Sequence, residues 1–215
     1  MVKAVFFDFD GVLTSEKNDI VVTCRYIADK LSKDEQAVRR IYEKSGDVWN
    51  LYGGKTTESA FWKEFFKKLA EASLISMPYD KFEKFREKAF ESTQLDSEMV
   101  CLARDIKNSG NKVGIITDNC KERIAVINKK YKLYILFDLI IVSAEEKTTK
   151  HEKGIFEKSI KKSGITASDS VFIDNNPDNC SVAEKAGMKA IHFDEVKRDY
   201  GKLLQDLIKL GLEIK

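Results

Sequence analysis

Two aspartates separated by one residue, Asp8 and Asp10, follow directly after a short apolar run, Ala4–Phe7. A continuous apolar run of this length is typical of a strand covered on both faces, as in a parallel sheet. Side chains alternate along extended backbone, so both carboxylates point roughly the same way, and Gly11 allows a close turn directly afterwards. Because burying an ionised carboxylate without a partner is costly, this pair requires a cation or hydrogen-bond donors.

Polar residues also end two later apolar runs. They are Thr117, Asp118 and Asn119 after one run, and Asp174, Asn175, Asp178 and Asn179 after the other. Three lysines between these runs could bring positive charge to the same place: Lys147, Lys150 and Lys153. Parallel strands end at one edge of their sheet, so we expect carboxylates, a hydroxyl group and an ammonium group to converge there.

Short apolar strands alternate with helical segments and predict an α/β fold. The expected strands are Ala4–Phe7, Val113–Thr117, Leu139–Ser143, Ser170–Asp174 and Ala190–Phe193. Crossover connections through helices imply a doubly wound, parallel, five-stranded Rossmann-like sheet with helices on both faces. Gly110 and Gly187 each follow an apolar helical stripe and precede a strand, which is where a helix-ending glycine is expected.

Residues 15–96 repeat their apolar positions at helical spacing and predict an all-helical insertion. Residues 1–14 plus 97–215 would then form the Rossmann-like core, and the segment Ser32–Glu35 resembles a capping box. The insertion leaves the core after the first strand and returns before the second. We therefore expect it to lie as a cap above the carboxyl edge, where open sheets bind ligands.

Composition excludes several classes of protein. The chain has 37 basic and 35 acidic residues, a net charge of +2, and so lacks the global field of a nucleic-acid-binding or membrane-coating protein. Its cysteines show no zinc or dithiol spacing and are expected to be reduced and at least half buried: Cys24, Cys101, Cys120 and Cys180. Without a signal-type segment or a run of membrane-spanning length, the sequence favours a cytoplasmic protein with neither nucleic-acid nor membrane partners.

The sequence DFDGVLT, from Asp8 to Thr14, resembles the first motif of the haloacid dehalogenase-like (HAD) hydrolase superfamily, in the branch with a helical cap after the first strand. The triplet ending at Thr117 fits the second motif, and Asp174 with Asp178 fits the spaced form of the fourth. Similarity of this kind extends over essentially the whole chain. It implies an aspartate-based phosphatase with bound magnesium.

The third motif is looser. Lys150–Phe156 keeps the family's lysine and its isoleucine–phenylalanine pair but lacks the prolines, so Lys150 is favoured while Lys147 and Lys153 stay open. Many relatives have asparagine where this chain has Asp118, and the adjacent-acid form of the fourth motif has aspartate where this chain has Asn175. An extra carboxylate near an anion would repel it, so Asp118 is expected to point away.

The resemblance implies a role for each matching residue. Asp8 would attack phosphorus and form an aspartyl phosphate, while Asp10 would act as general acid and then general base. Mg²⁺ would be held by Asp8, the backbone carbonyl of Asp10 and Asp174, with Asp178 or Asn175 completing the shell. The phosphate oxygens would be bound by Thr117 and Lys150, and Asp118 and Asn119, which follow Thr117, are counted with them as candidate substrate-binding residues.

We therefore expect a magnesium-dependent phosphatase acting on a small phosphate ester. A sugar phosphomutase and a non-catalytic regulatory protein of the same fold are the alternatives, and a dehalogenase is disfavoured because Asp10 is present. Neither the ester nor the oligomeric state can be read from the sequence. Four residues near Gly53–Gly54 could line the entrance, although packing or surface roles are favoured for each: Trp49, Tyr52, Lys55 and Trp62. Structural roles are also expected for His151 and His192.

Overall fold

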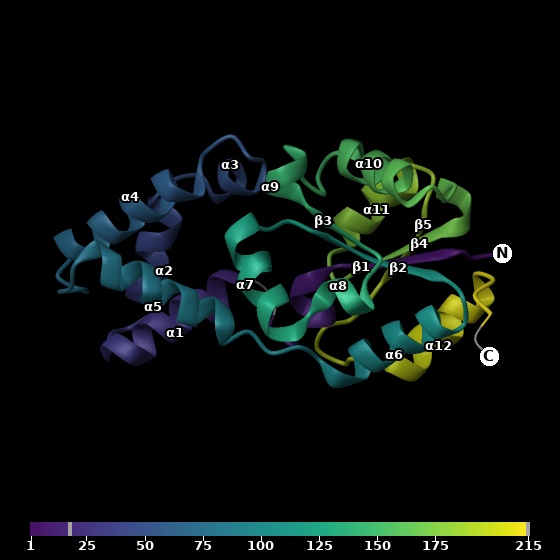
Figure 1. The fold of residues 1–215 in the computed structure, drawn as a ribbon, viewed down its shortest axis with the longest axis horizontal. Helices are drawn as coiled ribbons and strands as arrows, with labels where there is room; N and C mark the ends of the chain where they lie inside the picture. Colours follow the sequence, from purple (N-terminus) through teal and green to yellow (C-terminus); the bar gives the residue numbers. More distant parts are fainter. Residues whose placement is uncertain (17–18, 214–215) are drawn as a thin grey trace.

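Five parallel strands form one sheet in the order β3-β2-β1-β4-β5 (Figure 1). The computed structural model describes residues 1–16 and 19–213. Residues 17–18 and 214–215, which the expected ranges 15–96 and 97–215 include, lie outside the described residues. The strands are β1 (Ala4–Phe7), β2 (Lys112–Thr117), β3 (Leu139–Val142), β4 (Ser170–Asp174) and β5 (Lys189–His192).

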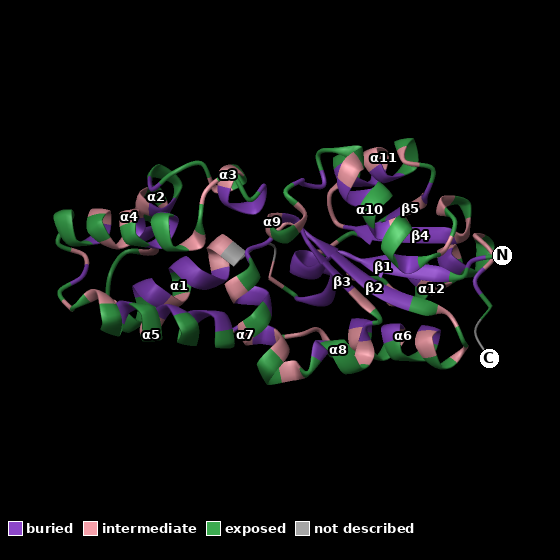
Figure 2. Ribbon diagram, turned by 45° about the horizontal axis from the view of Figure 1, so that its top comes forward, coloured by how far each residue is buried: buried purple, intermediate pink, exposed green. Residues whose placement is uncertain are grey.

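The predicted strands are confirmed closely. The bounds of β1 and β4 agree residue for residue. Strands β2 and β3 each differ from the prediction by one residue at one end, and β5 is shifted by one residue at both ends. Side chains of β1 alternate between two apolar clusters, with Val5 and Phe7 in one and Ala4 and Phe6 in the other. Both faces of the strand are thus buried, as Figure 2 shows, and this explains the uninterrupted apolar run.

Helices cover both faces of the sheet. Figure 1 shows α6 and α12 against one face and α10 and α11 against the other. The helices of this part are α6 (Ser97–Asn108), α7 (Lys121–Tyr131), α8 (Leu133–Leu136), α9 (Ser143–Glu146), α10 (Lys153–Ser163), α11 (Pro177–Lys185) and α12 (Tyr200–Lys209), with a short turn η2 (Ala167–Asp169). Gly110 and Gly187, both with φ of 89°, end α6 and α11 as predicted.

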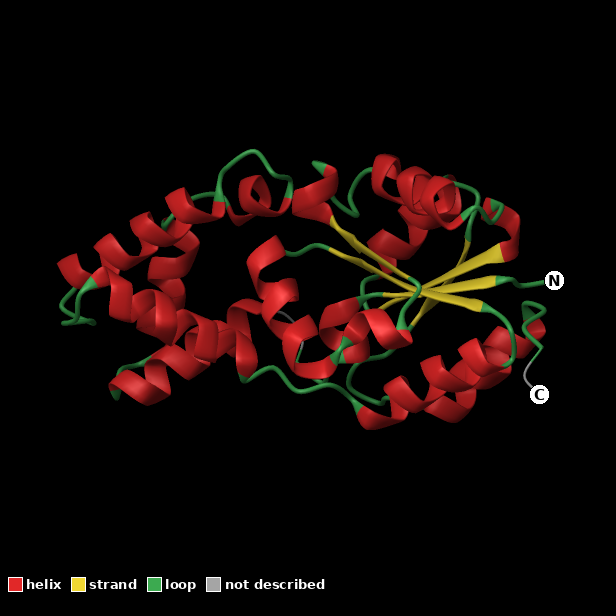
Figure 3. Cartoon of the chain, viewed as in Figure 1, coloured by secondary structure: helices red, strands yellow, loops and turns green. Residues whose placement is uncertain are grey.

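A wide turn, η1 (Phe9–Leu13), follows β1 and leads into five helices that lie beyond the sheet (Figure 3). They are α1 (Asp19–Leu31), α2 (Glu35–Lys44), α3 (Val48–Tyr52), α4 (Glu58–Glu71) and α5 (Tyr79–Glu91). Their apolar faces meet in a cluster rich in aromatic rings, including Tyr42, Phe61, Trp62 and Phe65. The domain boundaries proposed from the sequence stay a prediction.

The chain segments that lead into and out of these helices lie side by side. Thr14 and Leu95 form an isolated antiparallel bridge, and the Asp96 N–H donates to the Leu13 carbonyl oxygen at 2.9 Å. The two chain connections between the insertion and the core therefore lie together at one neck.

The expected capping box at Ser32–Glu35 is wrong in detail. Helix α2 begins at Glu35, and the Asp34 carboxylate accepts a hydrogen bond from the Ala37 N–H at 2.8 Å. Ser32 has a φ of 51° directly after α1. Asp34 caps the helix because it is the residue whose extended backbone immediately precedes the first turn.

All four cysteines are in the thiol form, without a disulfide bond among the described residues. Cys24, Cys120 and Cys180 are buried, as expected, whereas Cys101 on α6 is exposed, contrary to the expectation. Within residues 1–16 and 19–213, no helix is both long and apolar enough to cross a lipid bilayer.

A tight loop after α3 brings the inserted helices against the core at α9. Gly54 has a φ of 66°, and a Cβ at this position would lie 2.6 Å from the Ala144 carbonyl oxygen. A side chain cannot approach a backbone oxygen so closely, so glycine permits both the turn and the contact.

Replacing Gly54 with alanine tests this contact. Gly164, which ends α10, has a similar φ of 68°, but a Cβ there would meet no described atom within 4 Å, so it serves as the matched control. Gly164→Ala should cost only the backbone strain of a left-handed residue, about 1–2 kcal/mol. Gly54→Ala should lower the free energy of unfolding by more, because α3 must also move away from α9. Equal losses of unfolding free energy for the two variants in urea titrations would contradict this account.

Candidate active site

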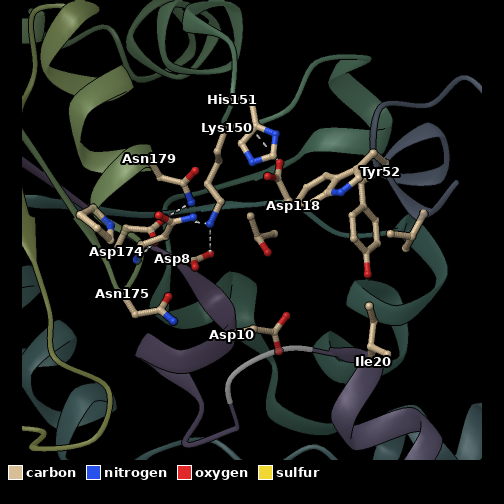
Figure 4. A pocket seen from close by; sticks show the side chains of 15 residues that line it. Asp8, Asp10, Ile20, Tyr52, Asp118, Lys150, His151, Asp174, Asn175 and Asn179 are labelled. Carbon is tan, nitrogen blue, oxygen red and sulfur yellow. Dashed lines mark hydrogen bonds and ion pairs between the residues drawn. The ribbon is translucent and has the colours of Figure 1, made fainter. Parts of the chain in front are cut away.

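A cavity of about 420 Å³ lies between the carboxyl edge of the sheet and helices α1 and α3 (Figure 4). Its lining residues are Asp8, Asp10, Ile20, Val48, Trp49, Tyr52, Thr117, Asp118, Lys150, His151, Asp174, Asn175, Asn176, Pro177 and Asn179. Polar groups from the ends of β1, β2 and β4 form its floor, as the parallel topology predicts.

At the centre of the floor, one ammonium group bridges two buried carboxylates. Lys150 Nζ lies 2.7 Å from Asp8 Oδ1 and 2.8 Å from Asp174 Oδ2. Burial, followed by repulsion from Asp174, raises the pKa of Asp8 well above its ordinary value, although Lys150 opposes the shift. Burial alone would lower the pKa of Lys150, but attraction to Asp174 and Asp8 outweighs it and raises that pKa, so the ammonium group stays charged.

Local backbone geometry holds Asp8 and Asp174 in place. The Asp8 N–H donates to the Ile173 carbonyl oxygen at 2.8 Å, which continues the pairing of β1 with β4. The Asp8 Oδ1 atom accepts from the Phe9 N–H at 2.7 Å. Gly11, with a φ of 82°, makes the close turn predicted for it, and a Cβ there would lie 2.6 Å from the Asn175 side chain.

Asp10 faces the same cavity and pairs with a fully buried arginine on α7. Arg123 donates from Nη1 to Asp10 Oδ2 at 2.7 Å and from Nη2 to Asp10 Oδ1 at 2.8 Å. Its Nη2 also lies 3.4 Å from the Thr93 hydroxyl, in the segment that returns from α5 to the core. A two-point ion pair of this kind fixes both the position and the orientation of the carboxylate.

The polar side chains at the end of β2 do not all line the cavity. Thr117 lines the cavity, but Asn119 is buried outside its lining and donates from Nδ2 to Asp10 Oδ2 at 3.0 Å. Asn119 therefore holds Asp10 rather than facing a ligand, contrary to its expected place among the substrate-binding residues. Asp118 lines the cavity and does not point away, because its Oδ1 accepts from the Lys150 N–H at 3.0 Å. Burial raises the pKa of Asp118, with Lys150 opposing the shift.

The Asp174 carboxylate accepts from three donors, two of which come from the segment that follows β4. These are Lys150 Nζ, the Asn176 N–H at 2.7 Å and Asn179 Nδ2 at 3.1 Å. Asn175 and Asn179 both line the cavity, and the buried Oδ1 of Asn179 has no hydrogen-bond partner among the described residues. Asp178 is exposed outside the lining, because the first turn of α11 directs it away and Asn179 inward.

Of the three candidate lysines, Lys150 alone lies in the cavity lining of the described chain. Lys147 is exposed and has a φ of 55° at the end of α9, and Lys153 is exposed at the start of α10. The structure thus brings Lys150 to the acidic cluster and leaves the other two on the surface.

An apolar wall faces the polar floor. It consists of Ile20, Val48, Trp49, Tyr52 and His151. The sequence predicts packing or surface roles for Trp49 and Tyr52 and a structural role for His151, yet all three line the cavity. Figure 4 shows Tyr52 and His151 beside it. Trp62 lies in the aromatic core of the inserted helices and Lys55 is outside the lining. His192 Nε2 lies 3.1 Å from the Asn175 carbonyl oxygen.

The donor chemistry of the floor fits a magnesium ion. Within residues 1–16 and 19–213, no three His, Cys, Asp or Glu side chains converge as a metal cluster. Mg²⁺, however, is commonly held by one or two carboxylates, with water and phosphate oxygens as its other ligands. Asp8 and Asp174 provide two buried carboxylates whose mutual repulsion a divalent cation would relieve, and the unpartnered Asn179 Oδ1 is a further oxygen.

Arg123 is the residue of this site that sequence reasoning missed. Helical spacing places it with Ile127 on the face of α7 that is buried. A charged residue on a buried helical face requires a partner, and that signal could have been found in the sequence. The identity of the partner, Asp10, could not, because 113 positions separate the two residues.

One family model matches most of the chain. The family model of the haloacid dehalogenase-like hydrolases matches residues 5–193. YhcW of Bacillus subtilis (strain 168), which is named as a phosphatase, is 21% identical over 196 residues, covering 89% of this chain and 83% of that protein.

Two fungal proteins match over shorter segments. The sesquiterpene phosphatase astK of Aspergillus oryzae (strain ATCC 42149 / RIB 40) is 26% identical over 100 residues, covering 46% of this chain and 51% of that protein. The drimenol cyclase drtB of Aspergillus calidoustus is 28% identical over 131 residues, covering 58% of this chain and 25% of that protein. The chain thus spans between a quarter and about half of the length of these two relatives.

Solved structures share the fold. The HAD family enzyme BT-2542 of Bacteroides thetaiotaomicron, as an Asp-to-Ala mutant in complex with magnesium and inorganic phosphate, has a TM-score of 0.71 at 20% identity, covering 94% of this chain and 99% of that chain. L-2-haloacid dehalogenase of Xanthobacter autotrophicus, with chloropropionic acid covalently bound, has a TM-score of 0.69 at 13% identity. The match covers 99% of this chain and 85% of that chain. At these identities the similarity establishes the architecture.

The contribution of the Arg123–Asp10 ion pair to the free energy of unfolding can be measured. Arg123→Met leaves the Asp10 carboxylate without its guanidinium partner and should lower the free energy of unfolding by about 3 kcal/mol in urea titrations. Adding Asp10→Asn to Arg123→Met removes the unpaired charge and should recover part of this loss. If Arg123→Met unfolds at the wild-type urea concentration, the pair does not hold Asp10.

Proposed function

The chain belongs to the haloacid dehalogenase-like hydrolase family, and we propose that it is a magnesium-dependent phosphatase that hydrolyses a small phosphomonoester. The observation that carries this proposal is the Asp8–Lys150–Asp174 cluster at the floor of a cavity that also contains Asp10. Phosphoryl transfer requires a nucleophile, positive charge around the moving phosphoryl group and a proton for the leaving oxygen. The phosphatase names of two relatives support the same reaction class.

Asp8 is the proposed nucleophile. Among the described residues, its two nearest donors, the Phe9 N–H and Lys150 Nζ, both reach Oδ1. Oδ2 is thus the oxygen that can attack phosphorus, forming an aspartyl phosphate as the phosphorus–oxygen bond to the alcohol breaks. Water then attacks the phosphorus of this intermediate, releasing phosphate and restoring Asp8.

Asp10 is the proposed general acid and base. It gives a proton to the departing alcohol oxygen and takes a proton from the attacking water, contributions that are typically about 10² to 10⁴ in rate. Arg123 and Asn119 act as positioning residues, because they hold the Asp10 carboxylate beside Asp8 at the cavity floor.

Lys150 and Thr117 are the proposed phosphate-binding residues. Lys150 stays protonated because of its acidic neighbours, and its ammonium group can hold a phosphate oxygen as it now holds carboxylates. Asp8, the backbone carbonyl of Asp10 and Asp174 would hold Mg²⁺, with Asn175 or Asn179 as further oxygen ligands. When bound, the ion supplies positive charge that reduces repulsion between the nucleophile and the phosphate.

The inserted helices are proposed to act as a cap. Contact between Gly54 and Ala144 holds α3 over the cavity, and α3 carries Trp49 and Tyr52 above the acidic floor. Excluding water strengthens the electrostatic interactions at the floor and limits the size of the ester.

Hydrolysis of p-nitrophenyl phosphate tests the proposal. Activity should require Mg²⁺, disappear with EDTA and return when the ion is added in excess. Asp8→Asn keeps the shape of the side chain but removes the nucleophile, so kcat should fall by at least about 10³ while circular dichroism shows an unchanged fold. Asp178→Asn, whose side chain is exposed outside the cavity, should keep its activity. Equal rates for Asp8→Asn and wild type would reject the mechanism.

A further inference from the structure

The cavity has two chemically different sides. Its floor carries the charged groups at the strand ends, whereas the opposite wall consists of two aliphatic side chains and three rings. Ile20 comes from α1, Val48, Trp49 and Tyr52 come from α3, and His151 follows Lys150 in the core. Figure 4 shows Ile20, Tyr52 and His151 at the cavity. The part of a phosphate ester that projects away from the floor would meet this wall.

Trp49 is the largest uncovered apolar group of the wall. Its ring lies 4.4 Å from that of His151 and 5.8 Å from that of Tyr52, between centroids, yet 45% of the residue remains exposed. An aromatic side chain buried on one side and open to a cavity on the other gains from a ligand that covers it. The Trp49–His151 contact also rules out a ligand ring between them, so the open face of the indole is the binding surface.

Charge in the cavity disfavours a second anionic group on the ligand. Four lining residues are acidic, and Lys150 is the single lysine or arginine among the described lining residues. That lysine is already engaged by Asp8 and Asp174. A carboxylate or second phosphate near the wall would find no lysine or arginine there among the described residues, would have His151 as its nearest basic side chain, and would face Asp118 and Asp10.

Hydrogen-bonding capacity on the wall is also small. Of its five residues, Trp49, Tyr52 and His151 each carry one or two polar side-chain atoms on an otherwise apolar ring, and Ile20 and Val48 carry none. Each hydroxyl group that a ligand buries without a partner costs binding free energy, so a ligand with many hydroxyl groups is penalised there.

We propose that the substrate is a phosphomonoester of an uncharged, largely apolar alcohol whose hydrocarbon portion covers Trp49. This inference rests on the proposed phosphatase activity and adds the substrate class. It excludes sugar phosphates, diphosphates and carboxylate-bearing phosphate esters as preferred substrates.

A matched pair of esters tests the substrate class. Cyclohexylmethyl phosphate and glucose 6-phosphate share a six-membered ring joined to the phosphate through one CH₂ group, but differ in their hydroxyl groups. The kcat/KM for cyclohexylmethyl phosphate should be at least about tenfold higher, a difference of about 1.4 kcal/mol. Equal values, or a preference for glucose 6-phosphate, would overturn the inference while leaving the phosphatase proposal intact.

Variants test whether Trp49 on the wall determines the preference for the apolar ester. Trp49→Ala should lower kcat/KM for cyclohexylmethyl phosphate about tenfold, mainly through KM, and that for methyl phosphate less than about twofold. Tyr134, a 62% exposed aromatic residue on α8 outside the cavity, provides the matched control as Tyr134→Ala, which should change neither value. Parallel losses on both esters with Trp49→Ala would show that the indole does not bind the alcohol.

A binding measurement separates this inference from turnover. The chain has two tryptophans, Trp49 and Trp62. Because Trp62 is only 1% exposed, a fluorescence change caused by altered exposure of tryptophan to solvent reports on Trp49. Cyclohexylmethylphosphonate, which a phosphatase cannot hydrolyse, should shift wild-type fluorescence to the blue in the presence of Mg²⁺ and leave Trp49→Phe unchanged. A blue shift without hydrolysis of any ester would refute the phosphatase proposal alone. Turnover of cyclohexylmethyl phosphate without the shift would refute the placement on Trp49.

Discussion

Two buried carboxylates held by one ammonium group are the constraint on which the rest of this site depends. Asp8 and Asp174 end neighbouring strands whose register pairs Phe7 with Ile173, so the sheet itself forces the two acids together. Their repulsion and burial would be strongly unfavourable without positive charge between them. Lys150 supplies that charge, and the same electrostatic demand makes the floor receptive to a divalent cation and a phosphate group.

Two of the connections between the inserted helices and the core lie beside Asp10 at this charged floor. One is the neck, where the Asp96 N–H bonds the Leu13 carbonyl oxygen just after the turn that carries Asp10. The other is Arg123, which pairs with Asp10 and also approaches Thr93 in the returning segment. The proposed proton-transfer group is therefore fixed at the junction of the insertion and the core, beside the cavity that the insertion covers.

Sequence patterns were sufficient to predict the features that depend on the order of residues within a short segment. Apolar runs located the strands to within a residue, and polar residues at their ends marked the edge where the cavity lies. Side-chain direction was less predictable. Asp178 and Asn179 are adjacent, and only the position at which α11 begins decides that Asn179 faces Asp174. Similarly, Asp118 faces the cavity because of a backbone N–H that lies 32 positions away in the sequence.

The stability of Lys150→Met, which retains much of the length of the side chain without its charge, tests the electrostatic claim most directly. In EDTA this variant should lose about 3 kcal/mol or more of unfolding free energy, because two buried carboxylates remain without a counter-charge. Saturating Mg²⁺ should then stabilise the variant more than it stabilises wild type. A variant as stable as wild type in EDTA, and indifferent to Mg²⁺, would contradict the account.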